Sequence, residues 1–336
     1  MIWLYSEKFG RKYNGLYQWR QGLAIPGKPG RLISHLQHLT IRCPETAQAP
    51  SFPSAPVPNS AAIPLYMQDS MASASITGIL AIALYAIASA MILRTLYGNS
   101  SPSSRIFLGI GLLAVLFHGV TLWQLIVTPS GVRLGLFPMA SMITGTGAAL
   151  IVLASLYRRL EWVSAMVFPL SALTLPPALW LDTGYTPHEL VHGVASHVIV
   201  SILAYAVLAI AAGHSVLLLI QHRQLKNGHI QGVMRLLPPV QIMEKMLFEL
   251  ILAGVILLSA AIITGFLYLD NMFDQNVAHK TILTLVAWGF FATLLVGRWW
   301  LGWRALTAVR LTLTGFAILV VAFFGSQLVL EVILGR

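Results

Sequence analysis

Histidines inside apolar stretches are the side chains of this chain best suited to chemistry. His118 interrupts one long apolar run, His197 and His214 lie near the start and the end of another, and His279 directly precedes a third. A neutral imidazole keeps one nitrogen lone pair, so it is both a hydrogen-bonding group and a metal ligand. Cys43 is the only cysteine. A disulfide framework, a Cys-x-x-Cys thiol pair and a Cys-x-x-Cys-His site for covalent haem are therefore excluded.

Lone histidines in apolar surroundings suit haem iron better than a hard cation. Calcium and magnesium need oxygen ligands. No carboxylate lies deep in an apolar run, because all four glutamates in question fall near run ends: Glu161, Glu244, Glu249 and Glu331. Imidazole is a regular axial ligand of haem iron in an otherwise apolar pocket. The alternative for each buried histidine is a structural hydrogen bond to a neighbouring helix.

The composition places these histidines in a membrane. Hydrophobic residues make up 57% of the 336, charged residues only 10%, and the mean hydropathy is +0.77. So few charges do not cover a water-soluble surface. The net charge of +10 is scattered between apolar runs and forms no continuous basic patch, so nucleic acid is not an expected partner. The expected partner of this surface is the lipid bilayer.

Apolar stretches long enough to cross a bilayer, about 20 residues each, recur eight times. The predicted spans are residues 72–93, 106–127, 138–156, 162–181, 194–220, 247–269, 281–296 and 309–333. The sequence thus predicts an all-α polytopic membrane protein. Eleven Lys or Arg follow spans one, three, five and seven, against three on the other face. By the positive-inside rule the first set is cytoplasmic and both termini lie outside.

Residues 1–70 differ from the eight-helix region, residues 71–336. They hold seven Lys or Arg and eight Pro, with no long apolar run. We expect a disordered tail. Seven basic residues beside an outward-facing terminus oppose the positive-inside rule, which favours a chain start at Met67 or Met71.

The run His197-Val-Ile-Val-Ser-Ile-Leu-Ala-Tyr205-Ala206 carries a family likeness, as do the segment from Lys280 to Trp288 and the later Gly315-Phe316. In this order they resemble the cytochrome c assembly membrane proteins of the CcsA and CcmC type, over roughly residues 72–336. The likeness is closest to the smaller YpjD-like and HemX-like branch. It implies a multi-pass protein of the bacterial inner membrane that binds or moves haem, or assists proteins that do. It implies non-covalent heme b and other membrane assembly proteins as partners, without enzymatic activity.

The chain also departs from that family. The family has a Trp-rich outward loop ending in Trp-Asp-Pro-Lys-Glu. This chain keeps Lys280 but lacks the tryptophans, and Val296 stands where a second membrane histidine would fall. His197 matches the outward histidine of the family. A subsidiary haem-binding or assembly role is therefore expected in place of ligation to apocytochrome.

Depth in the membrane selects the second ligand. With a rise of about 1.5 Å per residue, His197 lies roughly 5 Å below the outer boundary and His279 just outside it. His118 lies roughly 14 Å down by the same rise. We expect His197 and His279 as axial ligands, with His118 at a separate inner site or in a structural role. Two other functions stay open: regulation of haem synthesis through partners, and an accessory subunit of a cation transporter or efflux system.

The predicted topology is testable with reporter tags. Tags after Arg158 and within residues 223–235 should report the cytoplasm, and tags at Asp274 or Arg336 the outside, because Lys and Arg concentrate on the cytoplasmic side. A cytoplasmic signal at Arg336 would break the eight-span arrangement.

Overall fold

The computed structural model describes residues 62–97, 104–129, 131–157, 160–181, 192–226, 237–268 and 278–328. Contacts divide the chain into two units, Met1–Leu65 and Tyr66–Arg336. The second unit holds the helices discussed below, apart from the first four residues of the first helix. Most of the predicted tail, His188, the loop that contains Asp274, and Arg336 lie outside the described residues, so the expectations for them stay predictions.

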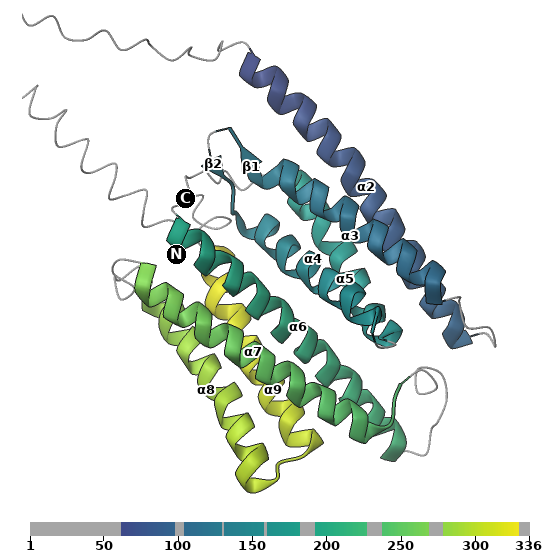
Figure 1. Ribbon diagram of the computed structural model, residues 1–336, viewed down its shortest axis with the longest axis vertical. Coiled ribbons are helices and arrows are strands. Elements are labelled where there is room, and N and C mark those ends of the chain that lie inside the picture. Colours follow the sequence, from purple (N-terminus) through teal and green to yellow (C-terminus); the bar gives the residue numbers. More distant parts are fainter. Residues whose placement is uncertain are drawn as a thin grey trace, which may run out of the picture. The chain divides into compact units, whose positions relative to one another are not determined.

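Eight helices in the described part of the chain are long and apolar enough to cross a membrane, as the sequence predicted. They are α2 (Ala62–Tyr97), α3 (Ser104–Ile126), α4 (Leu136–Ser155), α5 (Glu161–Trp180), α6 (His192–Lys226), α7 (Val240–Tyr268), α8 (Ala278–Leu301) and α9 (Ala305–Val320) (Figure 1). A π-helical turn, η2 (Val321–Gly325), and the short α10 (Ser326–Leu328) continue α9. The chain is a multi-pass membrane protein.

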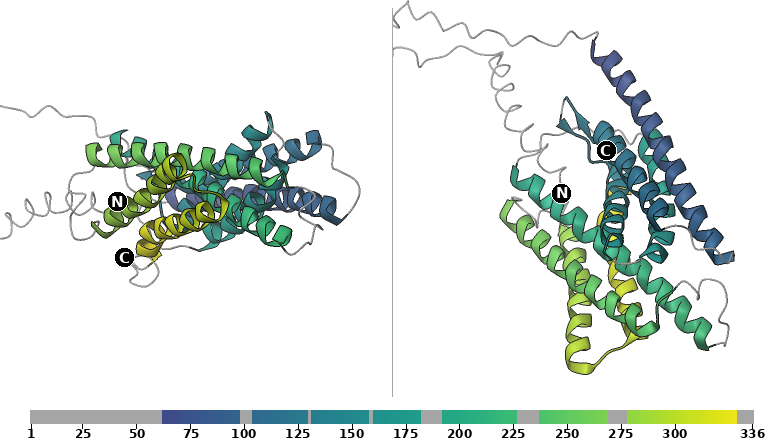
Figure 2. Two further views of the ribbon diagram at one scale, coloured as in Figure 1. Left: turned by 90° about the horizontal axis from the view of Figure 1, so that it is seen from below. Right: turned by 45° about the vertical axis from the view of Figure 1, so that its right-hand side comes forward.

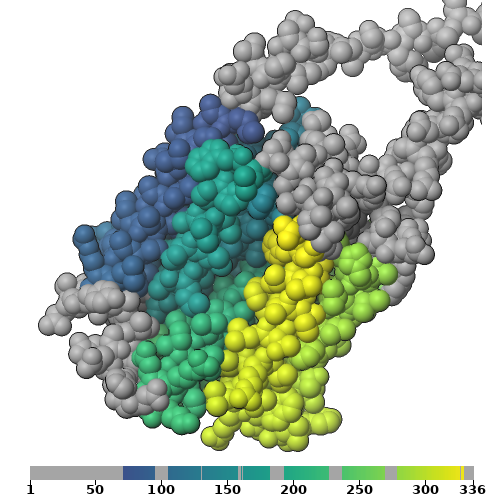
Figure 3. Space-filling view, turned by 180° about the vertical axis from the view of Figure 1, so that it is seen from behind, coloured from purple at the N-terminus to yellow at the C-terminus, as the bar shows by residue number. Residues whose placement is uncertain are grey.

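The helices pack in two groups joined by α6. Helix α4 packs on α3 and α5, while α6, α7, α8 and α9 form the second group. Helix α6 also contacts α4 and α5, which makes it the link between the groups (Figure 2). In the space-filling view α9 (yellow) runs along α8 (light green) (Figure 3).

Helix α2 shows how these helices choose their buried face. Its buried residues recur at alternating spacings of four and three, the stripe expected of a packed helix: Ala74, Gly78, Ala81, Tyr85, Ala88 and Ile92. The opposite face exposes large apolar side chains, among them Ile76 and Ile87. Exposed apolar side chains on a spanning helix face lipid. One face of α2 therefore packs on protein and the other contacts the lipid tails.

The structure extends several predicted spans, α6 and α7 among them, and adds a hairpin. Helix α7 begins at Val240, before the predicted residue 247, and α6 continues to Lys226. Both extensions carry charged residues. These fit there because a helix can continue past the hydrocarbon layer into the polar interface. Between α3 and α4 the chain forms a short antiparallel hairpin, β1 (Val127–Thr128) with β2 (Gly131–Val132), which the hydropathy pattern does not reveal.

An ion pair fixes α7 to the turn between α8 and α9. Arg298 Nη1 lies 2.6 Å from Glu244 Oε1 and donates to the Trp303 carbonyl at 3.1 Å. Its guanidinium also lies 4.7 Å from the centre of the Phe248 ring. Trp299 and Trp300 are exposed, as expected of an interfacial belt. Trp303 instead packs on α8 as part of this corner.

The contact between α6 and α7 requires a glycine. A Cβ on Gly254 would lie 2.4 Å from Cδ2 of buried Leu208. Gly254→Ala should therefore destabilise the purified protein by about 1–3 kcal/mol, the usual result of overpacking. Thermal unfolding in detergent measures this. Gly119→Ala is the control, since nothing lies within 4 Å of its Cβ position, and an equal loss in both variants would contradict the account.

Candidate functional site

His197 lies near the start of α6 and faces α7. Its imidazole is partly buried, and its Nδ1 lies 2.9 Å from the Ala261 carbonyl oxygen and 3.3 Å from Thr264 Oγ1. A carbonyl oxygen only accepts, so Nδ1 carries the proton and donates. The Nε2 nitrogen then keeps its lone pair.

The free side of the His197 ring is only weakly engaged. Ser201 Oγ lies 3.4 Å from Nε2, at the long limit of a hydrogen bond. A histidine that ligates a metal usually donates its other N–H to a carbonyl, which fixes the tautomer and the ring orientation. His197 has this arrangement, with the backbone of α7 as the orienting group.

Close helix packing holds His197 against α7. A Cβ on Gly193, four residues before His197, would lie 2.3 Å from the Tyr268 ring. With Gly254 further along, this lets α6 and α7 run side by side over their length (Figure 1). The α7 carbonyl that orients the imidazole is therefore held at a fixed distance from α6.

His279 lies at the same end of the helix bundle as His197. It is in the first turn of α8, whose start follows the Tyr268 end of α7, and its side chain is exposed. Its neighbour Lys280 donates to Gln327 Oε1 at 3.3 Å. Helix α8 packs chiefly on α9 and α7, so the two histidines stand on helices that share α7 as a neighbour.

His118 is 1% exposed and lies in the other helix group. Its Nδ1 is 3.2 Å from the Tyr85 hydroxyl of α2, and its Nε2 is 2.9 Å from Ser141 Oγ of α4. Gly145 lies against the ring, where a Cβ would come within 2.8 Å. Both nitrogens are used by protein hydroxyls, so this imidazole joins three helices.

Further polar side chains link α2 to α3 and α4 to α5, and the sequence pattern predicts none of these pairs. Thr121 donates to Thr77 at 2.9 Å, and Thr77 lies 3.2 Å from Gln124. Thr144 and Thr174 join α4 to α5 at 2.7 Å. Each of these residues interrupts an apolar run, which is the only sequence signal that marks them, and each satisfies a hydrogen bond that lipid cannot supply.

His214 takes a third role. It is 1% exposed, and its Nε2 donates to the Met243 carbonyl at 2.7 Å. Its ring centre lies 5.0 Å from that of Trp162, and its Nδ1 is buried without a hydrogen-bond partner. Within the described residues, no group of three or more His, Cys, Asp or Glu could hold a metal ion. A metal site built only of protein side chains is therefore not found there. Haem iron differs, because the porphyrin supplies most of its ligands and the protein can contribute a single imidazole.

Comparison with known proteins adds family information. The model of the cytochrome C assembly protein family matches residues 106–334. The chain is 28% identical over 258 residues to the inner membrane protein YpjD of Escherichia coli strain K12, covering 76% of this chain and 98% of that protein. An uncharacterized 28.8 kDa protein of Azospirillum brasilense is 31% identical over 161 residues, covering 47% of this chain and 55% of its own. No solved structure matches.

The contacts of His118 predict a loss of stability on its removal. His118→Ala leaves the buried Tyr85 and Ser141 hydroxyls without their partner, at a cost of about 1–3 kcal/mol. Thermal unfolding should therefore occur at lower temperature than in wild type. Lys226→Ala is the control, because that side chain is exposed and lies outside the proposed haem site. Unfolding of His118→Ala at the wild-type temperature would contradict a structural role.

Proposed function

The chain belongs to the cytochrome c assembly protein family, and on this premise we propose that it binds haem non-covalently through His197. The proposed role is haem handling in cytochrome c-type assembly, in the inner membrane. Inner-membrane placement agrees with the eight spanning helices and with YpjD, named an inner membrane protein.

The orientation of His197 supports this proposal most directly. Its Nδ1–H is committed to the Ala261 carbonyl, so Nε2 is the nitrogen that would meet iron. His118, by comparison, uses both nitrogens within the protein, and His214 Nδ1 is fully buried. Of these three buried or partly buried imidazoles, His197 alone combines an oriented ring with a nitrogen that only a weak contact occupies.

His279 is the proposed second axial ligand. It stands at the Tyr268 end of the bundle together with His197, and its exposed side chain is free to turn toward a cofactor.

Haem, when bound, supplies an iron centre whose reactivity the protein tunes through its axial ligands. The residues of the chain would hold the haem in place and orient it. Ala261 and Thr264 orient the His197 ring, and the packing of α6 on α7 sets its distance from the bundle axis. His118, proposed as a further haem-binding residue on sequence grounds, is better supported as a structural link between helices α2, α3 and α4.

Two other functions remain as outcomes of the test. A regulator of haem synthesis that works through partners would carry no haem itself. An accessory subunit of a cation transporter would depend on polar side chains within its spans, and the described spans hold hydroxyls and imidazoles there but no deep carboxylate.

Substitution of the histidines tests the proposal. In protein purified from cells supplied with haem, His197→Ala should abolish most of the Soret absorbance, because the oriented ligand is lost. His279→Ala should weaken or shift the band, and His188→Ala, the control, should leave it nearly unchanged. The readout is the absorbance spectrum normalised to protein.

The reverse pattern is decisive. If His197→Ala keeps the full wild-type spectrum while His118→Ala loses it, haem lies in mid-membrane and the proposed site is wrong. Unfolding temperatures of both variants separate loss of haem from loss of fold.

A further inference from the structure

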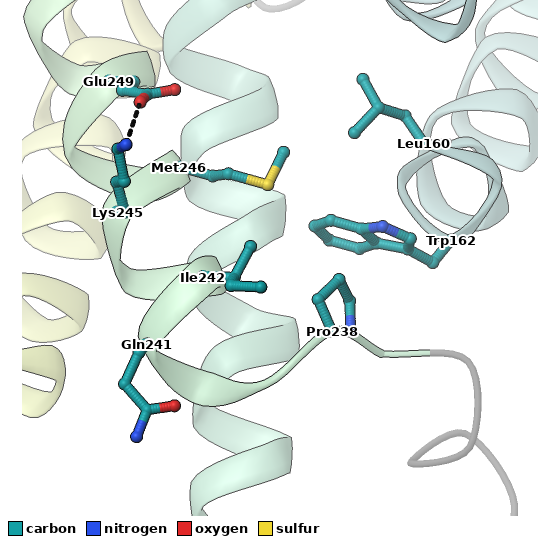
Figure 4. A pocket seen from close by; sticks show the side chains of 8 residues that line it. All are labelled: Leu160, Trp162, Pro238, Gln241, Ile242, Lys245, Met246 and Glu249. Carbon is teal, nitrogen blue, oxygen red and sulfur yellow. Dashed lines mark ion pairs between the residues drawn. The ribbon is translucent and has the colours of Figure 1, made fainter. Parts of the chain in front are cut away.

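A pocket of about 600 Å³ opens between the start of α5 and the start of α7 (Figure 4). One wall is Leu160 and Trp162, and the loop into α7 contributes Pro238. The first turns of α7 form the rest of the lining: Gln241, Ile242, Lys245, Met246 and Glu249. This volume is in the range of small-ligand sites, about 300–1,000 Å³.

The α7 wall of the pocket is divided along its length. Gln241, Lys245 and Glu249 follow one another at spacings of four and form a polar stripe on one face of the helix. Ile242 and Met246 form an apolar stripe beside it. In Figure 4 Ile242 and Met246 extend toward Trp162 and Leu160, so the floor is apolar and the polar stripe is its rim. The pocket therefore fits a molecule with a polar head and an apolar body.

The rim carries both signs of charge. Lys245 Nζ lies 4.0 Å from Glu249 Oε1, and the side chains are 79% and 48% exposed. An exposed pair at this spacing is weak, so a charged headgroup can compete with it. The neighbouring Glu244 lies outside the pocket lining and pairs with Arg298 at 2.6 Å.

The pocket lies at the basic end of the helix bundle. Exposed basic residues stand at this end of the spanning helices: Arg94, Arg105, Arg223, Lys226, Arg304 and Arg310. Lys and Arg concentrate where spanning helices meet lipid headgroups, and tryptophan is favoured at the same level. Ile242 is 51% exposed, and Ile256 further along α7 is 61% exposed, so the apolar stripe continues onto the lipid-facing surface.

We propose that this pocket binds one phospholipid with a zwitterionic headgroup, of the phosphatidylethanolamine kind. The phosphate lies at Lys245, the ammonium lies at Glu249, and the first part of an acyl chain lies against Ile242, Met246 and Trp162. A phosphatidylglycerol headgroup offers no ammonium and sets its negative charge beside the Glu249 carboxylate. The rim therefore selects the zwitterionic lipid. This site is separate from the proposed haem site at the opposite end of the helices.

Native mass spectrometry tests the proposal. The full chain is released from nanodiscs that contain equal amounts of phosphatidylethanolamine and phosphatidylglycerol, and retained lipids are identified by mass. Wild type should retain one phosphatidylethanolamine with a preference of about fivefold, the ratio expected from about 1 kcal/mol of charge interaction. Haem content is recorded in the same spectra, so failure here is distinguishable from failure of the haem proposal.

Three substitutions of exposed residues make the test specific. Ile242→Trp fills the pocket without a change of charge and should remove the retained lipid. Glu249→Gln should bring the preference close to one, and Lys245→Gln should lower retention of both lipids about threefold or more. Arg310→Gln, an exposed basic residue outside the pocket, should behave as wild type.

Equal retention of the two lipids by wild type would overturn the proposed selectivity. Retention of the same lipid by Ile242→Trp would show that the lipid binds elsewhere on the bundle. Unfolding temperatures confirm that each variant is folded before its spectra are compared.

Discussion

A polar group inside a bilayer must find its hydrogen-bond partner within the protein, because lipid tails offer none. This constraint explains the contacts that join the helices. His118 meets hydroxyls of α2 and α4, Tyr205 donates to the Leu319 carbonyl beside the π-helical turn, and Arg298 closes the end of α7 onto α8 and α9. These three side chains each link two or more helices, whereas others, such as Ser89 and Ser215, donate to a carbonyl of their own helix. The apolar faces remain for lipid.

The same constraint divides the histidines into two kinds, according to whether one ring nitrogen is left without a strong hydrogen bond to the protein. An imidazole with both nitrogens bonded to the protein, such as His118, links helices. An imidazole that donates one N–H to a backbone carbonyl and keeps a lone pair near the surface, such as His197, is oriented for a ligand. Membership of the cytochrome c assembly family identifies haem as the ligand to test there. His197 is therefore the residue at which the haem proposal is tested.

Sequence reasoning predicted the spanning helices to within a few residues at most ends, because hydropathy over about 20 residues records the bilayer directly. It also named His197 as a haem ligand, which stays a prediction. It did not pair Tyr85 with His118 or find Ser141, since partners on different helices depend on how the helices pack, which periodicity does not encode. The hairpin after α3 and the pocket beside Trp162 were missed for the same reason. Close packing at Gly145 and Gly254 likewise appears only once neighbouring helices are in place.

The central claim is that the intact chain carries haem. The most direct measurement is the haem content of wild-type protein, expressed with ample haem, purified in detergent, and assayed by its Soret band and by pyridine haemochrome against protein concentration. The account predicts close to one non-covalent haem per chain. Clean apoprotein, under conditions in which a known membrane haem protein purifies loaded, would contradict it and favour a regulatory role through partners.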